Sequence, residues 1–378
     1  MIKLTNIHYA AATIMTTVIG VGIFGIPFSF AKAGFVTGLI FLFGIAVISL
    51  LINLMYGEIV LRTAGQHQII GHAGKYLGSF ARYIMFFAFI FGIYGAMTAT
   101  IAISGTFWAN VLYFIDSSPY MFSILFFAVA AVVYLKGLKT VSRVDFAVIL
   151  FFTVVILIIA IFGAGSIDLN NFSTVFMKEF WFLPFGVILF SFAGMSSIPL
   201  AKEITKGREN DLKKAIWWGS IVPAVLYLVF SLTVFGISGE VTSPDAISGL
   251  SSFLGPVIIF VGALLGSFST FTVFINTSIA LGESFEYDLG MSRRKSQLLV
   301  LLPPFVLFLI GIRDFIEIIG LVGSISVGLT GVITILIYLK AKQKGDRQPE
   351  YSLNLPNWLL YLLVAIFGGG IMYSFVFF

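Results

Sequence analysis

The chain has 378 residues, of which 59% are hydrophobic and only 10% are charged, and its formal net charge is +5. An apolar content this high over this length excludes a soluble globular domain and predicts a polytopic, all-α membrane protein. The sequence contains no cysteine, which excludes disulfides and thiolate chemistry.

Apolar stretches that can cross a bilayer as helices, which needs about 20 residues each, recur along the whole chain. We predict eleven of them, at roughly 8–33, 35–61, 82–114, 119–136, 142–163, 181–203, 214–237, 251–285, 297–312, 315–340 and 356–377. The loop over 63–81 is expected to form a short helix at the membrane interface.

Basic residues fall on one side of these predicted spans. With the N-terminus in the cytoplasm, 19 of the 22 Lys and Arg residues lie in cytoplasmic segments, and only Lys32, Lys178 and Arg313 lie outside. This asymmetry obeys the positive-inside rule. It predicts a multi-pass protein of the cell membrane with a cytoplasmic N-terminus and a C-terminus outside.

The first predicted span is interrupted between Gly20 and Pro27, a stretch with three glycines and one proline. In a helix interior, glycine costs roughly 1 kcal/mol and proline roughly 3 kcal/mol relative to alanine. The sequence therefore favours two half-helices joined by an unwound stretch. Because unpaired backbone at membrane depth is tolerated only where protein buries it or where it lines a cavity, such a break indicates a site. The alternative is a proline kink that packs against neighbouring helices.

The sixth predicted span is interrupted in the same way between Phe190 and Pro199, where small and polar residues again precede an Ile-Pro pair. The two Ile-Pro pairs lie 172 residues, or five spans, apart, so the two copies run in opposite directions across the membrane. Paired interrupted helices in corresponding positions indicate the binding site of a transporter. The predicted architecture is a single domain over 1–378, with inverted repeats at about 8–163 and 181–340 and an extra helix at about 356–377.

The stretch from Ile19 to Phe28, followed by Ala-Lys-Ala-Gly at 31–34, resembles the first-helix motif of the amino acid/auxin permease family, within the amino acid-polyamine-organocation superfamily. The residues from Ser191 to Glu203 are similar to the sixth helix of that family, and those from Glu58 to Gly65 resemble the end of its second helix. The resemblance covers the whole chain and is nearest to the hydroxy and aromatic amino acid permeases. It implies a leucine-transporter-type fold, with five-plus-five inverted helices and spans 1 and 6 broken at the site.

An amino acid substrate carries a carboxylate and an ammonium, and two broken helices can bind both charges through the backbone. The N-terminus of a half-helix offers free N–H groups to the carboxylate, and glycine lets that backbone come close. Carbonyls at the C-terminal end of the other half-helix would meet the ammonium. Tyr94 is a candidate hydroxyl donor, with helix packing as its alternative role. The predicted substrate residues are Thr17, Gly20, Val21, Gly22, Tyr94, Phe190, Ser191, Ala193 and Gly194.

The eighth predicted span is rich in hydroxyl side chains, and oxygen ligands of this kind suit a hard cation such as Na⁺. Ser269, Thr272 and Asn276 share a helix face, and in similar transporters the eighth helix meets the first around a sodium ion. Hydrogen bonding between helices is the alternative role. The predicted ion ligands are Thr16, Ile19, Ser269, Thr270 and Thr272.

Glu58 lies at membrane depth, where an ionisable residue can act as a proton carrier. Arg62 follows it at i+4, a favourable spacing for an ion pair. We favour the ion pair, and with it Na⁺ rather than H⁺ as the coupling ion.

Together these features predict a secondary active transporter, not an enzyme, for neutral or aromatic amino acids. It would work by alternating access with Na⁺ or H⁺ as the coupled ion. A carrier of the same fold for a metal ion or another small cation, and a non-transporting amino acid sensor, are the alternatives. Beyond bound Na⁺ no cofactor is expected, and no nucleic acid partner.

Overall fold

The computed structural model describes residues 5–65, 67–115, 118–137, 142–173 and 176–377, and this part of the chain is helical without any strand. The α-helices are α1 Asn6–Val18, α2 Gly22–Ala33, α3 Phe35–Arg62, α4 Ile69–Leu77, α5 Ser79–Val111, α6 Pro119–Leu135, α7 Ser142–Gly163, α8 Leu183–Ser191, α9 Ile198–Ile204, α10 Asn210–Ser238, α11 Pro256–Glu283, α12 Arg293–Leu309, α13 Phe315–Leu321, α14 Gly328–Lys344 and α15 Asn357–Phe377. Short 3₁₀ segments are η1 Ala164–Ser166, η2 Leu169–Ser173, η3 Met195–Ser197, η4 Gly239–Val241 and η5 Ser248–Ser252, and π-helical segments are η6 Ser284–Asp288 and η7 Val322–Val327.

Within the described residues, eight helices are long and apolar enough to cross a membrane, or nine if the bent pair α1 and α2 forms one span. Every stretch predicted as a span is mostly helical within the described residues. The two predicted stretches outside this set of nine, 119–136 and 297–312, correspond to α6 and α12, which have 17 residues each. The short helix expected in the loop over 63–81 is α4.

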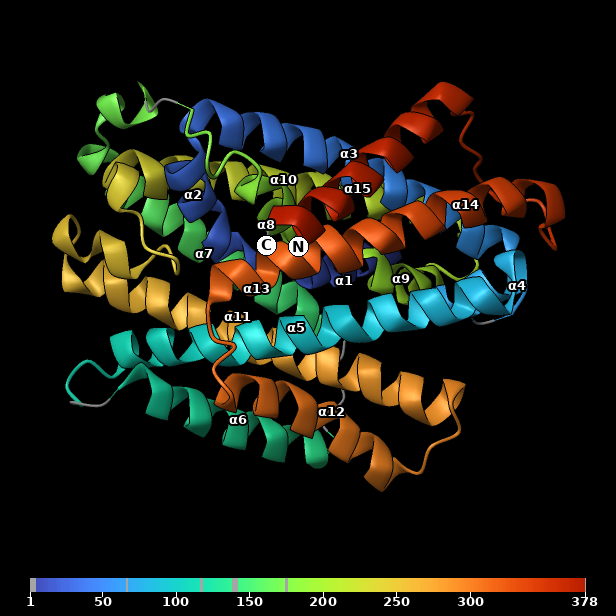
Figure 1. The fold of residues 1–378 in the computed structure, drawn as a ribbon, viewed down its shortest axis with the longest axis horizontal. Coiled ribbons are helices and arrows are strands. Elements are labelled where there is room, and N and C mark those ends of the chain that lie inside the picture. Colours follow the sequence, from blue (N-terminus) through green and yellow to red (C-terminus); the bar gives the residue numbers. More distant parts are fainter. Residues whose placement is uncertain (1–4, 66, 116–117, 138–141, 174–175, 378) are drawn as a thin grey trace.

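The helices form two groups, each with its own apolar core. In the lower part of Figure 1, α5, α6, α11 and α12 pack on one another. Their core contains Met97, Phe126, Phe274 and Phe308, all buried. A second and larger core joins the first interrupted span to α3, α8, α9 and α10. α5 and α11 contribute to both cores, for example through Ile103 and Leu265 in the larger one, so these two helices join the two groups.

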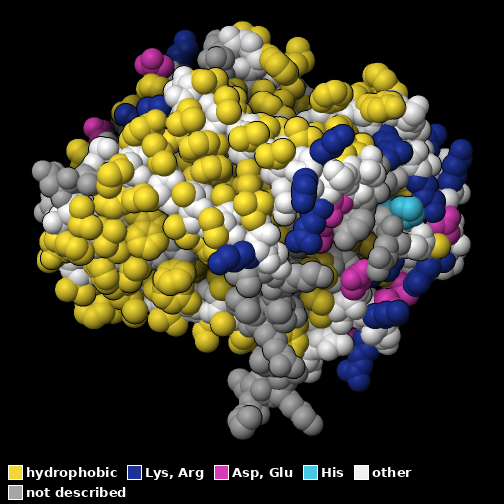
Figure 2. Space-filling view, turned by 90° about the horizontal axis from the view of Figure 1, so that it is seen from below, with side chains coloured by type: hydrophobic (Ala, Val, Ile, Leu, Met, Phe, Trp, Pro, Cys, Tyr) yellow, Lys and Arg dark blue, Asp and Glu magenta, His cyan; other side chains and the backbone are white. Residues whose placement is uncertain are grey.

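The outer surface is apolar along the sides of the molecule and basic at one end. On α3, the exposed side chains of Val36, Ile40, Phe43 and Val47 recur at helical spacing and form a stripe that suits lipid. Figure 2 shows broad hydrophobic surface, with most of the visible Lys and Arg side chains gathered at the end where α4 lies in Figure 1.

Small residues bring α8 close to the tenth predicted span. A Cβ atom added to Gly186 would lie 2.8 Å from the carbonyl carbon of Gly320, and one added to Gly323 would lie 2.8 Å from the backbone nitrogen of Phe190. α8 is therefore held against this span by backbone contact close to its own break.

Candidate functional site

The first predicted span is broken between α1 and α2, which differ in direction by 51°. α1 ends at Val18 and α2 begins at Gly22. The unwound stretch is therefore Ile19–Val21, shorter and earlier than the interruption expected over Gly20–Pro27. The proline itself lies within α2. There it removes a single backbone hydrogen bond, which membrane helices packed among neighbours tolerate.

The sixth predicted span is broken where its sequence indicates. α8 ends at Ser191, and α9 begins at Ile198 after the 3₁₀ turn η3. The Ser197 hydroxyl donates a hydrogen bond to the Gly194 carbonyl at 2.7 Å, which fixes the end of the unwound stretch. Pro199 lies in the first turn of α9, where the absence of an N–H costs nothing.

The two breaks lie against each other. A Cβ atom added to Gly22 would lie 2.5 Å from the Ser191 hydroxyl oxygen and 2.8 Å from the Ser191 Cα, distances that real Cβ atoms essentially never show. A Cβ atom added to Gly194 would lie 2.5 Å from a methyl carbon of Val18. Only glycine permits this approach, which brings residues 169 positions apart in the sequence into direct contact.

This contact places helix ends of opposite polarity side by side. The first N–H groups of α2, from Gly22 onward, have no partner inside their helix, and this end carries partial positive charge. The last carbonyls of α8, up to Ser191, lie at an end with partial negative charge. Such a pair of ends can bind an anionic group and a cationic group of one small molecule without any charged side chain.

The other predicted substrate residues lie at different distances from this contact. Phe190 and Ala193 are half-buried next to the second break. Thr17 is half-buried at the end of α1, and its hydroxyl donates to the Thr13 carbonyl at 2.9 Å. The hydroxyl of Tyr94 donates to the Leu299 carbonyl of α12 at 2.8 Å. It is therefore engaged between α5 and α12, and the structure does not bring it to the breaks.

The predicted ion ligands on α11 differ in burial, since Ser269 and Thr270 are buried and Thr272 is half-buried. A Cβ atom added to Gly20 would lie 2.8 Å from a methyl carbon of Val273, so the first break contacts α11 one turn after Ser269. Ser269 Oγ is buried and has no hydrogen-bond partner within the described part of the chain. Thr272 bonds to the Phe268 carbonyl at 2.9 Å, on the face where the Phe268 ring contacts α7.

The hydroxyls of two further predicted ion ligands donate hydrogen bonds within their own helices. Thr16 donates to the Ala12 carbonyl at 3.0 Å, and Thr270 donates to the Ser267 carbonyl at 2.8 Å. Each bond consumes the proton and leaves oxygen lone pairs, which are what a cation needs.

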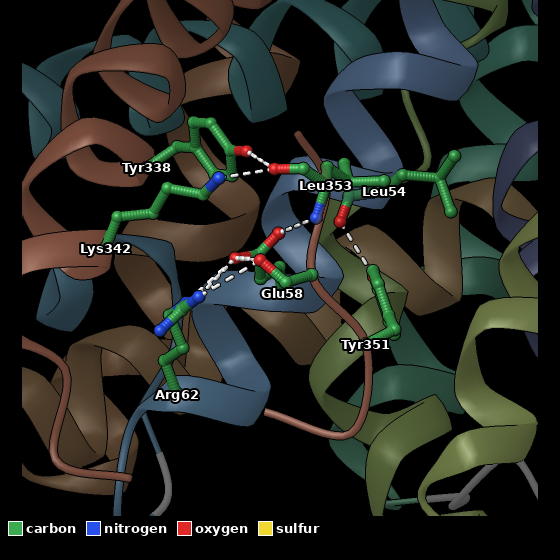
Figure 3. Close-up of polar contacts among 8 residues, drawn as sticks. Leu54, Glu58, Arg62, Tyr338, Lys342, Tyr351 and Leu353 are labelled. Carbon is green, nitrogen blue, oxygen red and sulfur yellow. Dashed lines mark hydrogen bonds and ion pairs between the residues drawn. The ribbon is translucent and has the colours of Figure 1, made fainter. Parts of the chain in front are cut away.

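Glu58 is fully buried and forms the ion pair expected with Arg62, at 2.8 Å. Figure 3 shows the carboxylate between Arg62 and the connector that joins α14 to α15. It accepts hydrogen bonds from the Ser352 hydroxyl at 3.0 Å and from the Leu353 backbone N–H at 2.6 Å. The connector is held further by the Tyr351 hydroxyl, which donates to the Leu54 carbonyl at 2.7 Å. This carboxylate therefore anchors a chain segment to the end of α3.

Sequence reasoning missed Tyr227, which lies on α10 between the two breaks. Its hydroxyl is 2.6 Å from the Val18 carbonyl oxygen and 2.8 Å from the Ser191 carbonyl oxygen. The residues around it form an ordinary apolar helix, so the only signal in the sequence is a tyrosine at membrane depth.

An open cavity of about 360 Å³ lies along α2 and the first turns of α8 and α13. Its lining combines aromatic rings with charges of both signs, and includes Phe28, Lys32, Phe182, Asp314 and Glu317. The cavity lies toward the end of α2 that is farther from the break.

Known proteins match this chain over almost its whole length. The tryptophan/tyrosine permease family matches residues 3–374. A tyrosine permease of Enterobacter agglomerans is 27% identical over 400 residues, which cover 95% of this chain and 92% of the relative. A low affinity tryptophan permease of Escherichia coli K12 is 26% identical over 92% of this chain and 90% of the relative.

A third relative is tyrosine-specific transport system 1 of Haemophilus influenzae, which is 22% identical over 88% of each chain. Among solved structures, the crystal structure of MhsT in complex with L-phenylalanine shares the fold, with a TM-score of 0.69 over 98% of both chains and 13% sequence identity. These matches confirm the resemblance noted in the sequence. The chain belongs to the tryptophan/tyrosine permease family, whose members are multi-pass membrane transporters and not enzymes.

Proposed function

We propose that this chain is a secondary active transporter that moves neutral amino acids, aromatic ones first, across the membrane by alternating access. The observation that supports this best is the contact between two interrupted helices, at Gly22 and Ser191. Relatives named tyrosine permease and tryptophan permease favour an aromatic side chain. Ala193, a small and half-buried residue at the second break, favours a large side chain over a small one, whereas the space beside Gly194 is filled by Val18.

In this proposal the substrate binds as a zwitterion between the breaks. Its carboxylate meets the backbone N–H groups of Val21 and Gly22, with Thr17 beside them. Gly20 belongs to the same stretch, but its N–H already donates to the Val18 carbonyl at 2.8 Å. Its ammonium meets the carbonyls at the end of α8, around Phe190, Ser191 and Ala193. The opposite polarity of the two helix ends supports this orientation. Tyr94 is the least supported member of the set, because its hydroxyl is bonded to the Leu299 carbonyl.

We further propose eleven spans arranged as inverted repeats, over about 8–163 and 181–340, with α15 as an extra helix. The lengths of corresponding helices support this pairing. The second spans, α3 and α10, have 28 and 29 residues, and the fourth spans, α6 and α12, both have 17. The first span of each half is the broken one. Matched lengths and matched breaks are expected when two halves share one plan.

The basic end of the molecule would face the cytoplasm, with the N-terminus inside and the C-terminus outside. The gathering of Lys and Arg at the α4 end supports this orientation. A reporter inserted in the segment 340–350 is expected inside, and one fused behind the last residue is expected outside. Finding both on one side would contradict the odd number of spans.

Sodium is the coupling ion that we propose, with a proton as the alternative. Thr16, Ile19, Ser269, Thr270 and Thr272 would supply the oxygens. The buried Ser269 hydroxyl on the α11 face that meets the first break supports a site there. Arg62, Ser352 and Leu353 together occupy the Glu58 carboxylate, which favours an anchoring role for Glu58 over that of a proton carrier.

Uptake of labelled tryptophan or tyrosine into proteoliposomes tests the function. Unlabelled neutral aromatic amino acids are expected to compete, and uptake is measured separately under a sodium gradient and a proton gradient. Competition by acidic or basic amino acids alone would contradict the proposed substrate class. Empty liposomes and protein-free extracts are the controls.

A further inference from the structure

The hydroxyl of Tyr227 contacts the ends of two half-helices at once. Val18 is the last residue of α1 and Ser191 is the last residue of α8. The carbonyl oxygens of both lie within 2.8 Å of Tyr227 Oη.

The chemistry of helix ends explains why a donor is needed there. The last carbonyls of a helix have no partner inside it, and each C-terminus carries partial negative charge. Here two such ends converge in a buried place, where unpaired carbonyls are costly and repel each other. A phenol has one proton for the two oxygens, and the Val18 carbonyl also accepts from the Gly20 N–H at 2.8 Å. The Tyr227 hydroxyl therefore contacts a carbonyl of each break rather than a carbonyl of one break alone.

The ring of Tyr227 is held as firmly as its hydroxyl. The residue is fully buried, and its ring meets the ring of Phe192, the first residue of the second break, edge to face with centroids 5.0 Å apart. α10 itself packs against α1, α2 and α9, three of the four helices that flank the breaks. The hydroxyl thus has little freedom to move away from the two carbonyls.

We propose that Tyr227 is a positioning residue for transport, whose single hydroxyl sets the spacing between the two helix breaks. This proposal rests on the proposed function, because the substrate would bind to Gly22, Ser191 and Ala193 beside these carbonyls. Tyr227 acts through the backbone of the breaks and does not itself need to touch the substrate. Removal of the hydroxyl loosens the spacing, so binding weakens while the helices remain in place.

The test compares Tyr227→Phe with Tyr338→Phe in purified protein and in proteoliposomes. Tyr338 is a suitable control because it is also buried and its hydroxyl donates at 2.6 Å to the backbone carbonyl of Leu353, which belongs to neither break. Tyr227→Phe is expected to raise the KM for aromatic amino acids about tenfold with a smaller change in kcat, as follows from removing the donor to the buried Ser191 carbonyl. Tyr338→Phe is expected to keep the wild-type KM.

Hydrogen–deuterium exchange without substrate gives a second readout. Amides over 15–25 and 186–196 are expected to exchange faster in Tyr227→Phe than in the wild type and in Tyr338→Phe. This result would support the positioning role even if no aromatic amino acid were transported. Transport by the wild type together with an unchanged KM and unchanged exchange in Tyr227→Phe would overturn the role of Tyr227 alone.

If Tyr227→Phe is not recovered in a folded state, 3-fluorotyrosine at position 227 replaces it. This residue keeps the ring and the hydroxyl and makes the hydroxyl a stronger proton donor. Slower exchange at both breaks is then expected. Exchange identical to that of the wild type at both breaks would overturn the proposal.

Discussion

Replacement of Gly22 by alanine should push the two helix breaks apart. The added Cβ atom would lie 2.8 Å from the Cα of Ser191, whereas ordinary van der Waals contact begins at 3.4 Å. A backbone atom cannot rotate out of the way as the end of a side chain can. α2 and α8 must therefore separate by about 0.6 Å, the difference between these two distances.

The expected size of the effect follows from this separation. Overpacking of a close-packed contact costs about 1–3 kcal/mol, and a misplacement of about 1 Å in a site can cost about 100-fold in function. We therefore expect Gly22→Ala to weaken aromatic amino acid binding by about 10- to 100-fold while the protein remains folded. Gly22→Val, which adds two more carbons, should abolish binding.

The assay is direct binding of labelled tryptophan to purified protein, together with a thermal unfolding curve for each variant. Gly44→Ala is the matched control, because Gly44 lies on the exposed face of α3 and an added Cβ would meet nothing within 4 Å. A folded Gly22→Ala variant with wild-type affinity would refute the reasoning and remove Gly22 from the site.

Three further predictions concern the ion site, Glu58 and His72. Ser269→Ala should raise the sodium concentration needed for half-maximal uptake, whereas full uptake without sodium that collapses with the pH gradient would assign coupling to protons. Glu58→Gln should retain transport but lower the free energy of unfolding by about 1–3 kcal/mol, because the hydrogen bonds that the buried carboxylate accepts from Arg62, Ser352 and Leu353 weaken when its charge is removed. A folded variant without coupled transport would instead make Glu58 the proton carrier. Burial lowers the pKa of His72 to about 3, whereas an unfolded histidine has a pKa of about 6.5. Between these values only the unfolded chain takes up the proton, so stability should fall as pH drops below about 6.5, by about 1.4 kcal/mol per pH unit. Between pH 7 and pH 5, the melting temperature of His72→Gln should fall less steeply with decreasing pH than that of the wild type. An identical pH dependence in the two proteins would contradict the burial argument.

The two interruptions could be predicted because they rest on local chemistry. Glycine and proline are costly inside helices, and a pair of such defects five spans apart has few explanations in an apolar chain. The exact limits of the first break could not be predicted. The sequence from Gly20 to Pro27 contains four poor helix formers, yet the helix resumes at Gly22. The packing of α2 among buried neighbours outweighs the cost of its own residues.

Contacts between distant residues mark the limit of what the sequence reveals. The pair of Glu58 with Arg62 follows from a spacing of four residues. The bonds from Ser352 and Leu353 to the same carboxylate join positions 294 and 295 residues apart, and no local pattern indicates them. The same holds for Tyr94, which looks suitable for substrate until its bond to Leu299 is known.

Gly22 and Tyr227 contact the same short segment from two sides, so their effects should not be independent. Gly22 allows the backbone of Ser191 to come close, and Tyr227 joins the carbonyl of that residue to Val18. Once alanine at position 22 has moved α8 away, the hydroxyl can no longer reach both carbonyls, and its loss should matter less. The double variant Gly22→Ala/Tyr227→Phe should therefore bind more tightly than the two single effects predict, with an interaction energy of about 0.5–3 kcal/mol. Gly44→Ala combined with Tyr227→Phe should be additive. Additivity in both pairs would mean that the two breaks are separate features and not one site.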